Sequence, residues 1–184
     1  VHAHGNIGGR ESRVDPLMGN MMGHETVIAD LRRAREDEDV KAIIFRVDSG
    51  GGESLASDLI GHEIEICASV KPVVVSMVDV AASGGYSISY RATKIVADPL
   101  CVTGSIGSIS GKFDLSGLYE KAGIRHDGIG RGPNAWVDSD QTGYTDEQWA
   151  RFTEDHWAGF NRWLTDICEH RGLAFADAES LAHG

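Results

Sequence analysis

Two apolar runs rich in β-branched residues, each ending in glycines, constrain the fold more than any other feature of the sequence. Lys41–Asp48 reads K-A-I-I-F-R-V-D and leads through Ser49 into the triplet Gly50–Gly52. Val73–Val80 leads into A-A-S-G-G-Y at Ala81–Tyr86. A helical pattern follows each glycine turn. Strands that alternate with helices are joined by crossover connections, so the sequence predicts an α/β fold with a mainly parallel sheet flanked by helices.

Other elements are predicted from local signals. The polar stretch after Ile7 is expected to be a loop, and Ile124–Ile129 a short strand. Thr145 and Gln148 have the spacing of a capping box, which predicts the start of a long helix. The expected buried stripe of that helix comprises Phe152, His156, Phe160, Trp163, Leu164 and Ile167. A short helix is predicted over Phe175–Ala182.

Composition excludes several classes of protein. The chain carries 17 basic and 28 acidic residues, a net charge of −11, whereas a nucleic-acid binder needs a basic face. Three cysteines are too few for a disulfide framework or a cysteine-rich zinc site, and they are expected to be reduced. His2 and His4 alone are too few ligands for a metal, so no metal site is predicted. No apolar run reaches the roughly 18 residues of a membrane span, so this segment is expected to be soluble.

The two junctions between strand and helix are the candidate sites, because ligands bind at the carboxyl ends of parallel strands. At Gly50–Gly52 the backbone amides are able to approach a substrate closely, although a tight structural turn explains the same residues. At the second junction Ser83 lies between two alanines and two glycines, and the N–H of Gly84 is placed to stabilise an oxyanion. For an isolated Ser-Gly-Gly, a small residue filling a crowded helix start is the simpler interpretation.

Four motifs, taken together, resemble the signal peptide peptidase A (protease IV) family, a branch of the Clp protease and crotonase superfamily. They are R-V-D-S-G-G-G at Arg46–Gly52, K-P-V-V-V-S-M at Lys71–Met77, A-A-S-G-G-Y at Ala81–Tyr86 and T-G-S-I-G at Thr103–Gly107. The motifs occur in the family's order, and the resemblance extends across almost the whole chain. It implies a Clp protease/crotonase-like spiral of βαβ units.

The resemblance implies a serine peptidase of the Ser/Lys type that uses no cofactor. Ser83 matches the nucleophile, and Ser105 matches the serine that orients the lysine base. The oxyanion hole is expected to combine the N–H of Gly84 with that of Gly51 or Gly52. A lysine acts as a base only when it is neutral, a state that burial favours.

The sequence departs from the family pattern at two positions. Gly50 replaces the proline usual in the first turn. Ala135 stands at the position of the lysine base, and no lysine follows Lys121. In the family's long form, two tandem copies of the domain share one site, with the lysine in the amino-terminal copy and the serine in the carboxyl-terminal copy. Residues 1–184 therefore resemble the carboxyl-terminal copy: a single serine-peptidase-like domain from a longer tandem protein, inactive by itself because another domain or subunit supplies the lysine.

The remaining candidate bases fit poorly. Three of the five lysines stand at the starts of predicted strands, about 17 Å from the carboxyl-end site: Lys41, Lys71 and Lys94. Lys121 is expected on a solvated helix face. Lys112 is not excluded by its position, although the family assigns it no role. His126 is more often structural on a short strand.

The resemblance also implies partners and a location. Peptide substrates such as signal peptide remnants are expected, together with assembly into homo-oligomers and membrane association of the parent protein at the extracytoplasmic face. Two other functions stay open. A crotonase-like acyl-CoA enzyme uses paired backbone amides without a serine nucleophile, and a non-catalytic assembly domain retains the motifs alone.

Overall fold

The computed structural model describes residues 1–182, which form two compact units. Unit 1 comprises Val1–Gly107 together with the chain from Leu164 onward, and unit 2 comprises Ser108–Trp163. The long helix α5 (Asp146–Arg171) begins in unit 2 and ends in unit 1. No helix of the described residues combines the length and the apolar character that crossing a bilayer requires.

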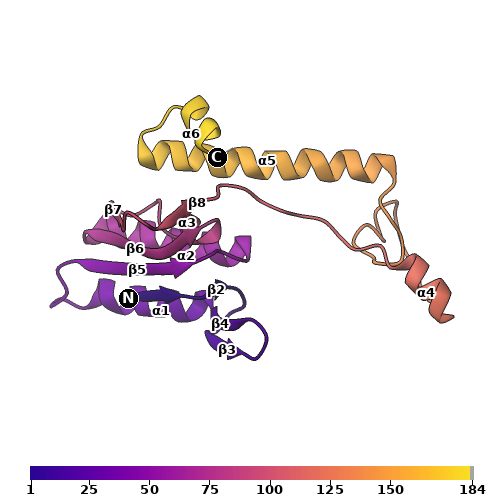
Figure 1. The fold of residues 1–184 in the computed structure, drawn as a ribbon, viewed down its shortest axis with the longest axis horizontal. Coiled ribbons are helices and arrows are strands. Elements are labelled where there is room, and N and C mark those ends of the chain that lie inside the picture. Colours follow the sequence, from indigo (N-terminus) through magenta and orange to yellow (C-terminus); the bar gives the residue numbers. More distant parts are fainter. Residues whose placement is uncertain (183–184) are drawn as a thin grey trace. The chain divides into compact units, whose positions relative to one another are not determined.

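A parallel sheet organises unit 1 (Figure 1). Its strands are β1 (His2–His4), β5 (Ile43–Ser49), β6 (Val73–Ala82), β7 (Lys94–Ala97) and β8 (Val102–Gly104). Strand β6 is central: it pairs with β5 on one side, and on the other with β7 along its first half and with β8 at its end. Every pair is parallel, which confirms the predicted α/β fold with crossover connections.

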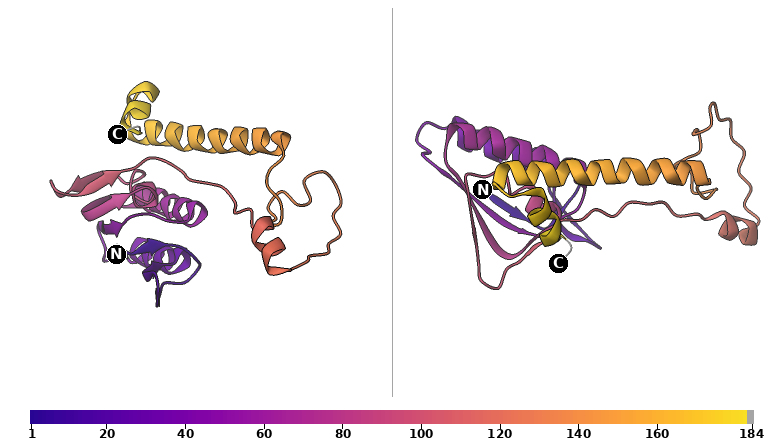
Figure 2. Two further views of the ribbon diagram at one scale, coloured as in Figure 1. Left: turned by 45° about the vertical axis from the view of Figure 1, so that its right-hand side comes forward. Right: turned by 90° about the horizontal axis from the view of Figure 1, so that it is seen from above.

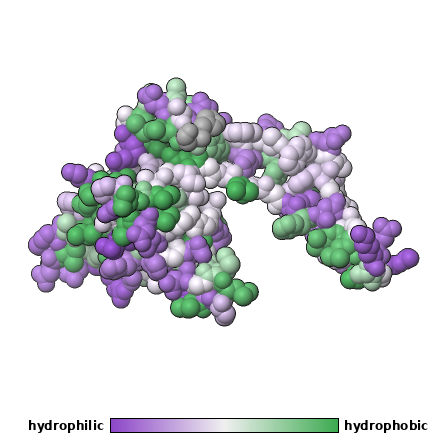
Figure 3. All heavy atoms as spheres, viewed as in Figure 1, coloured by the Kyte–Doolittle hydropathy of each residue, from purple (hydrophilic) through white to green (hydrophobic). Residues whose placement is uncertain are grey.

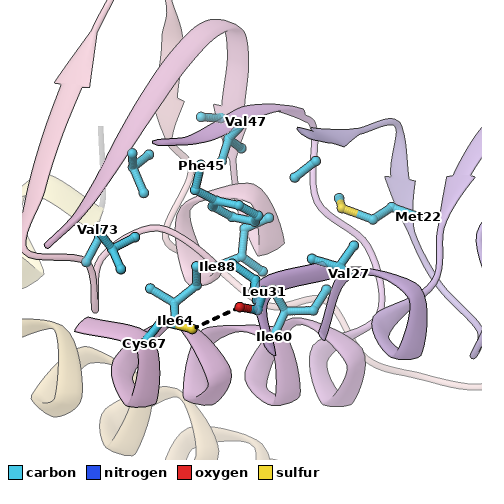
Figure 4. Packing of buried hydrophobic residues seen from close by; sticks show 14 of the residues in the cluster. Met22, Val27, Leu31, Phe45, Val47, Ile60, Ile64, Cys67, Val73 and Ile88 are labelled. Atoms are coloured by element: carbon cyan, nitrogen blue, oxygen red, sulfur yellow. Dashed lines mark hydrogen bonds between the residues drawn. The ribbon is translucent and has the colours of Figure 1, made fainter. Parts of the chain in front are cut away.

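Helices α1 (His24–Glu36) and α2 (Ser54–Val70) lie side by side against this sheet (Figure 2). Alternate side chains of β5, among them Phe45 and Val47, point toward Leu31, Ile60 and Ile64 of the helices and form the core (Figure 4). The other face of β5 is largely exposed, so this strand is buried on one face only. Of the three free cysteines, Cys67 is buried in this core, and Cys101 and Cys168 are half-buried.

A second sheet has three strands, two of which lie in the segment after Ile7 that was predicted as a loop. It consists of β2 (Asn6–Ile7), β3 (Arg13–Asp15) and β4 (Gly19–Met22), with β3 and β4 antiparallel. The loop prediction was wrong because the turn chemistry was overlooked. The Asp15 carboxylate accepts hydrogen bonds from the N–H groups of Leu17 and Met18 at 2.9 and 3.0 Å, which stabilises the β3–β4 turn.

Unit 2 contains α4 (Ser116–Ala122) and most of α5, and none of its residues is buried. The capping box is confirmed by reciprocal bonds between Thr145 and Gln148, at 3.1 and 3.2 Å. The predicted strand over Ile124–Ile129 is absent, because no neighbouring strand supplies backbone partners. The predicted buried stripe of α5 holds only for its last two members, Leu164 and Ile167, which belong to unit 1.

The helices at the end of the described chain agree more closely with the sequence-based prediction. Helix α5 ends at Arg171, and Gly172 has a φ of +65°, the left-handed conformation typical of a helix end. Helix α6 (Phe175–Ala182) has the bounds that its sequence predicts.

In unit 2, hydrophobic side chains reach the surface around α4 (Figure 3), where Phe113 is 82% exposed.

Candidate active site

Ser83 occupies a strained turn between β6 and α3 (Gly84–Ser87). Strand β6 ends at Ala82, and the helix begins at the residue after the serine. The backbone of Ser83 has φ 52° and ψ −118°, outside the regions that L-residues ordinarily adopt. Such a conformation costs about 1–3 kcal/mol and persists only where the surrounding structure enforces it. The geometry is that of a nucleophile elbow, which presents a hydroxyl at the end of a strand.

Ser105 lies beside Ser83 because of the register of β6 and β8. The pairing ends at Ala82 opposite Gly104, and the Ser83 N–H donates to the Gly104 carbonyl at 2.9 Å. Each of these two strands is followed by a serine with positive φ. The φ of Ser105 is 47°. Among residues 1–182 these two serines are the only non-glycine residues with positive φ. Ser83 is half-buried and Ser105 is exposed.

The two glycine turns are in backbone contact. A Cβ atom on Gly51, whose φ is +102°, would lie 2.5 Å from the Gly84 nitrogen and 2.9 Å from the Ser83 Cβ. A Cβ atom on Gly84 would lie 3.1 Å from the Gly52 nitrogen and 2.6 Å from the Ser57 Oγ. Both positions therefore exclude any side chain. The predicted residues Ser83, Gly84, Gly51 and Gly52 come together at the carboxyl ends of β5 and β6.

The amides of these turns differ in their hydrogen bonding. The Gly51 N–H donates to the Ser49 Oγ at 3.2 Å. Within residues 1–182, the N–H groups of Gly52 and Gly84 have no acceptor. Two amides without acceptors, next to a serine at a strand end, are suited to bind an oxygen that gains negative charge.

No lysine of unit 1 lies near Ser83 along the sheet. Lys94 pairs with Val74 at the start of β6. At the usual rise per residue this is about 26 Å from the carboxyl end of β6. Lys71 precedes β6 and donates to the carbonyls of Ala34 and Asp37. Lys41 lies just before β5 and donates to the Glu38 carbonyl.

The other candidate bases belong to unit 2. Lys112 donates to the Ser139 carbonyl at 3.0 Å, and its Nζ lies 4.6 Å from the centre of the Tyr144 ring. Lys121 is exposed on α4. The ring of His126 packs edge-on against Tyr119, with 4.5 Å between ring centres, and no strand carries it. Ala135 is exposed in a loop between α4 and α5.

Two serines that the sequence analysis did not single out contact the glycine turns. Ser49 is the last residue of β5 and bonds to Gly51. Ser57, in the first turn of α2, donates to the Glu53 carbonyl at 2.9 Å and adjoins Gly84. A polar residue at the end of an apolar strand was the available signal for Ser49. Ser57 looks like an ordinary polar helix residue in the sequence, so only the tertiary structure identifies it.

A polar cluster anchors the end of α5 in unit 1. The Tyr90 hydroxyl and the Arg91 guanidinium both donate to the Asp166 carboxylate. Burial alone would raise the pKa of Asp166, but hydrogen bonds from Tyr90 and Arg91 outweigh it and hold the pKa below its usual value. Burial, followed by the bond to Asp166, raises the pKa of Tyr90.

The family model of peptidase family S49 matches residues 65–184. The chain belongs to this family. It is 48% identical over 131 residues to the chloroplastic serine protease SPPA of Arabidopsis thaliana, covering 70% of the chain and 19% of that protein. It is 44% identical over 108 residues to Protease 4 of Haemophilus influenzae, covering 58% of the chain and 18% of that protein.

Solved structures of two other proteases have a similar fold. A mutant of the membrane-bound stomatin-specific protease 1510-N matches with a TM-score of 0.53 and 15% identity, covering 98% of this chain and 70% of that one. A ClpP1 mutant from Listeria monocytogenes matches with a TM-score of 0.53 and 16% identity, covering 98% of this chain and 76% of that one. These matches confirm the Clp protease-like fold. The S49 chain nevertheless spans only about a fifth of the length of SPPA and of Protease 4.

Proposed function

We propose that this chain is the serine-bearing part of a serine endopeptidase of family S49, with Ser83 as the nucleophile. The observation that carries the proposal is the conformation of Ser83: a serine held at φ 52° where β6 meets α3, beside the N–H groups of Gly52 and Gly84. A small residue that merely fills a helix start does not require a strained backbone. Family membership supports the same reaction.

In the proposed mechanism the Ser83 Oγ attacks the carbonyl carbon of the scissile peptide bond, and its proton passes to a neutral lysine amine. The carbonyl oxygen becomes an oxyanion, which accepts hydrogen bonds from the N–H groups of Gly84 and of Gly52 or Gly51. When the tetrahedral intermediate collapses, the C–N bond breaks and the leaving amine takes the proton from the lysine. Water then hydrolyses the acyl ester on Ser83 and restores the hydroxyl.

The lysine base comes from another domain or subunit. In support of this, Ala135 stands at the expected lysine position, and the lysines of unit 1 begin their strands far from Ser83. Ser105 orients the incoming lysine, which its place beside Ser83 in the β6–β8 register favours. The chain thus corresponds to the carboxyl-terminal copy of a tandem protein, and without its partner it does not turn over substrate.

The proposed substrates are signal peptide remnants or other unfolded peptides, and the parent protein is membrane-associated, with this domain at the extracytoplasmic face. The motif resemblance to signal peptide peptidase A supports both assignments. Assembly into homo-oligomers, which enclose the serine sites, belongs to the same proposal.

The test is hydrolysis of a peptide ester by this chain together with its lysine-bearing partner domain. Ser83→Ala is expected to lower kcat by about 10⁴-fold or more. Ser87→Ala, a change of the same size one helical turn further on, is expected to leave kcat within about twofold. Equal hydrolysis by Ser83→Ala and the unaltered protein would overturn the proposal. Binding of coenzyme A without labelling of Ser83 by a fluorophosphonate would support an acyl-CoA enzyme instead.

A further inference from the structure

We propose that Ser49 is a positioning residue for the oxyanion hole, and that its hydroxyl determines which amide of the first glycine turn faces the substrate. By holding the Gly51 N–H, Ser49 leaves the Gly52 N–H to act together with that of Gly84. This inference rests on the proposed function, because it concerns the same oxyanion.

Ser49 faces the core because it continues the alternation of β5. Phe45, Val47 and Ser49 are buried, whereas the residues between them are exposed or half-buried. Ser49 itself is only 2% exposed. Strands β5 and β6 pair regularly as far as Val47 opposite Met77, and the register then shifts so that Ser49 lies opposite Ala81. The extra residues of this shift lie on β6, so the direction of the Ser49 side chain is unchanged.

The Ser49 hydroxyl bonds to two backbone segments. Its Oγ lies 2.7 Å from the Gly5 carbonyl oxygen, to which it donates, and 3.2 Å from the Gly51 nitrogen. A hydroxyl has a single proton to donate, and the Gly5 carbonyl is able only to accept. The oxygen of Ser49 must therefore accept the Gly51 N–H. One side chain thus ties the end of β1 to the first glycine turn.

The same contacts leave Gly52 as the available donor. The Gly51 carbonyl accepts the Ile7 N–H at 2.9 Å, so both backbone groups of Gly51 have partners. Within residues 1–182 the N–H of Gly52 has none, and its nitrogen lies 3.1 Å from the place where a Cβ on Gly84 would be. The two amides without acceptors are therefore neighbours, on either side of the contact between the turns.

The glycine triplet makes this restraint necessary. Three consecutive glycines have more backbone freedom than any other tripeptide, and position 50 lacks the fixed φ that a proline would provide. Without the Ser49 hydroxyl, the Gly51 N–H and the Gly5 carbonyl would lose their partners in a buried place. The peptide groups of the turn would then be free to rotate, and the Gly52 N–H would no longer be fixed.

The test measures how fast a fluorophosphonate labels Ser83 in the full chain at about pH 9.5, where hydroxide replaces the lysine as base. Saturation kinetics separate the inactivation rate constant from reagent binding. Ser49→Ala is expected to lower the rate constant by about 10- to 100-fold, within the loss caused by removing one oxyanion donor, and to leave binding within about twofold. Ser49→Thr, which keeps a hydroxyl, is expected to restore most of the rate.

Ser89→Ala is the matched control. Ser89 is also fully buried, and its hydroxyl donates to the Gly85 carbonyl at 2.7 Å without contacting the first turn. The inactivation rate constant of Ser89→Ala is expected to stay within about twofold of that of the unaltered chain. If Ser49→Ala does not fold, Ser49→Cys keeps the shape and weakens the hydrogen bonds, and it is expected to give a smaller loss of the same kind.

The two proposals fail in different ways. Labelling of Ser83 at equal rates in Ser49→Ala and the unaltered chain would overturn the role of Ser49 and leave the proposed function intact. A loss of equal size in Ser89→Ala would also overturn it, because any buried hydroxyl would then matter equally. Absence of labelling at Ser83 both at about pH 9.5 and in the presence of the lysine-bearing partner domain would overturn the proposed function, and the role of Ser49 with it.

Discussion

Unit 1 and unit 2 contain similar kinds of side chain but bury them very differently. In unit 1 the sheet and two helices enclose large residues completely, among them Phe45, Leu31 and Ile64. In unit 2 no residue is buried, although Trp149 and Trp157 lie on its longest helix and are 56% and 54% exposed. The difference lies in the layers: a helix buries its apolar stripe only against a second element, and unit 2 has no sheet.

The comparison bears directly on the candidate site. Ser83 and Ser105, the two serines with positive φ, both belong to the unit with the core. Strain of about 1–3 kcal/mol at each is sustained by packing around β6 and its neighbours. Ala135, at the position expected for the base, belongs to the unit without buried residues. All the residues proposed to act in this chain therefore belong to the unit that has a core.

The largest loss of stability is expected when a buried phenylalanine is replaced. Phe45→Ala removes a fully buried ring from unit 1 and is expected to lower the free energy of unfolding by about 3–5 kcal/mol. Phe113→Ala in unit 2, where the ring is 82% exposed, is expected to cost about 0.5 kcal/mol or less. Urea denaturation of the two variants measures both. Equal losses would contradict the difference in packing.

A second comparison uses ion pairs. The Glu63 side chain is 3% exposed and accepts from Arg32 at 2.9 Å and from Arg35. Glu63→Gln removes the buried charge that both guanidinium groups face, which leaves Arg35 only a 3.6 Å contact with the exposed Glu36. The substitution is expected to cost about 3 kcal/mol in urea denaturation. Glu154→Gln is the control in unit 2, where the exposed carboxylate lies 3.9 Å from Arg151; its loss is expected to be below about 0.5 kcal/mol. A reversed order would show that burial does not set the strength of these pairs.

The Asp166 cluster gives unit 1 a dependence on pH. Because the pKa of Asp166 is lowered on folding, the unfolded chain binds its proton more readily, and the stabilisation is present above the unfolded pKa of about 3.9. It is lost as the pH falls through the lower pKa of the folded state. Asp166→Asn is therefore expected to cost about 1–2 kcal/mol at pH 7 and much less in strong acid, as measured by denaturation at each pH. A constant cost at every pH would contradict the assignment.

The smallest effect is expected at the start of α5. Thr145→Ala removes the hydroxyl that accepts the Gln148 N–H at 3.2 Å and is expected to cost about 1 kcal/mol. Hydrogen exchange is the suitable measurement, because unit 2 has no core that would spread the loss over the whole chain. Faster exchange in the first turns of α5, with unchanged exchange in β6, is expected. Unchanged exchange at the start of α5 would show that the cap does not stabilise the helix.

The success of the sequence-based predictions also differs between unit 1 and unit 2. The apolar strands β5 and β6, the glycine turns that follow them and the capping box depend on local patterns, and the structure reproduces them. The second sheet of unit 1 was missed. The side-by-side placement of Ser83 and Ser105 follows from the β6–β8 register, which local patterns do not specify. Two predictions were wrong: the strand over Ile124–Ile129, and the buried stripe in the part of α5 that belongs to unit 2. Apolar periodicity produces a strand or a buried face only where a partner layer exists.

The most direct test of the central claim is to locate the covalent adduct after treating the chain and its lysine-bearing partner domain with a fluorophosphonate. Mass spectrometry of the digested protein is expected to find one adduct, on Ser83, at neutral pH, and none in Ser83→Ala. The adduct is expected to form at least about tenfold more slowly without the partner domain, because no base is then available. An adduct on another serine, or peptide hydrolysis that persists in Ser83→Ala, would contradict the claim that Ser83 is the nucleophile.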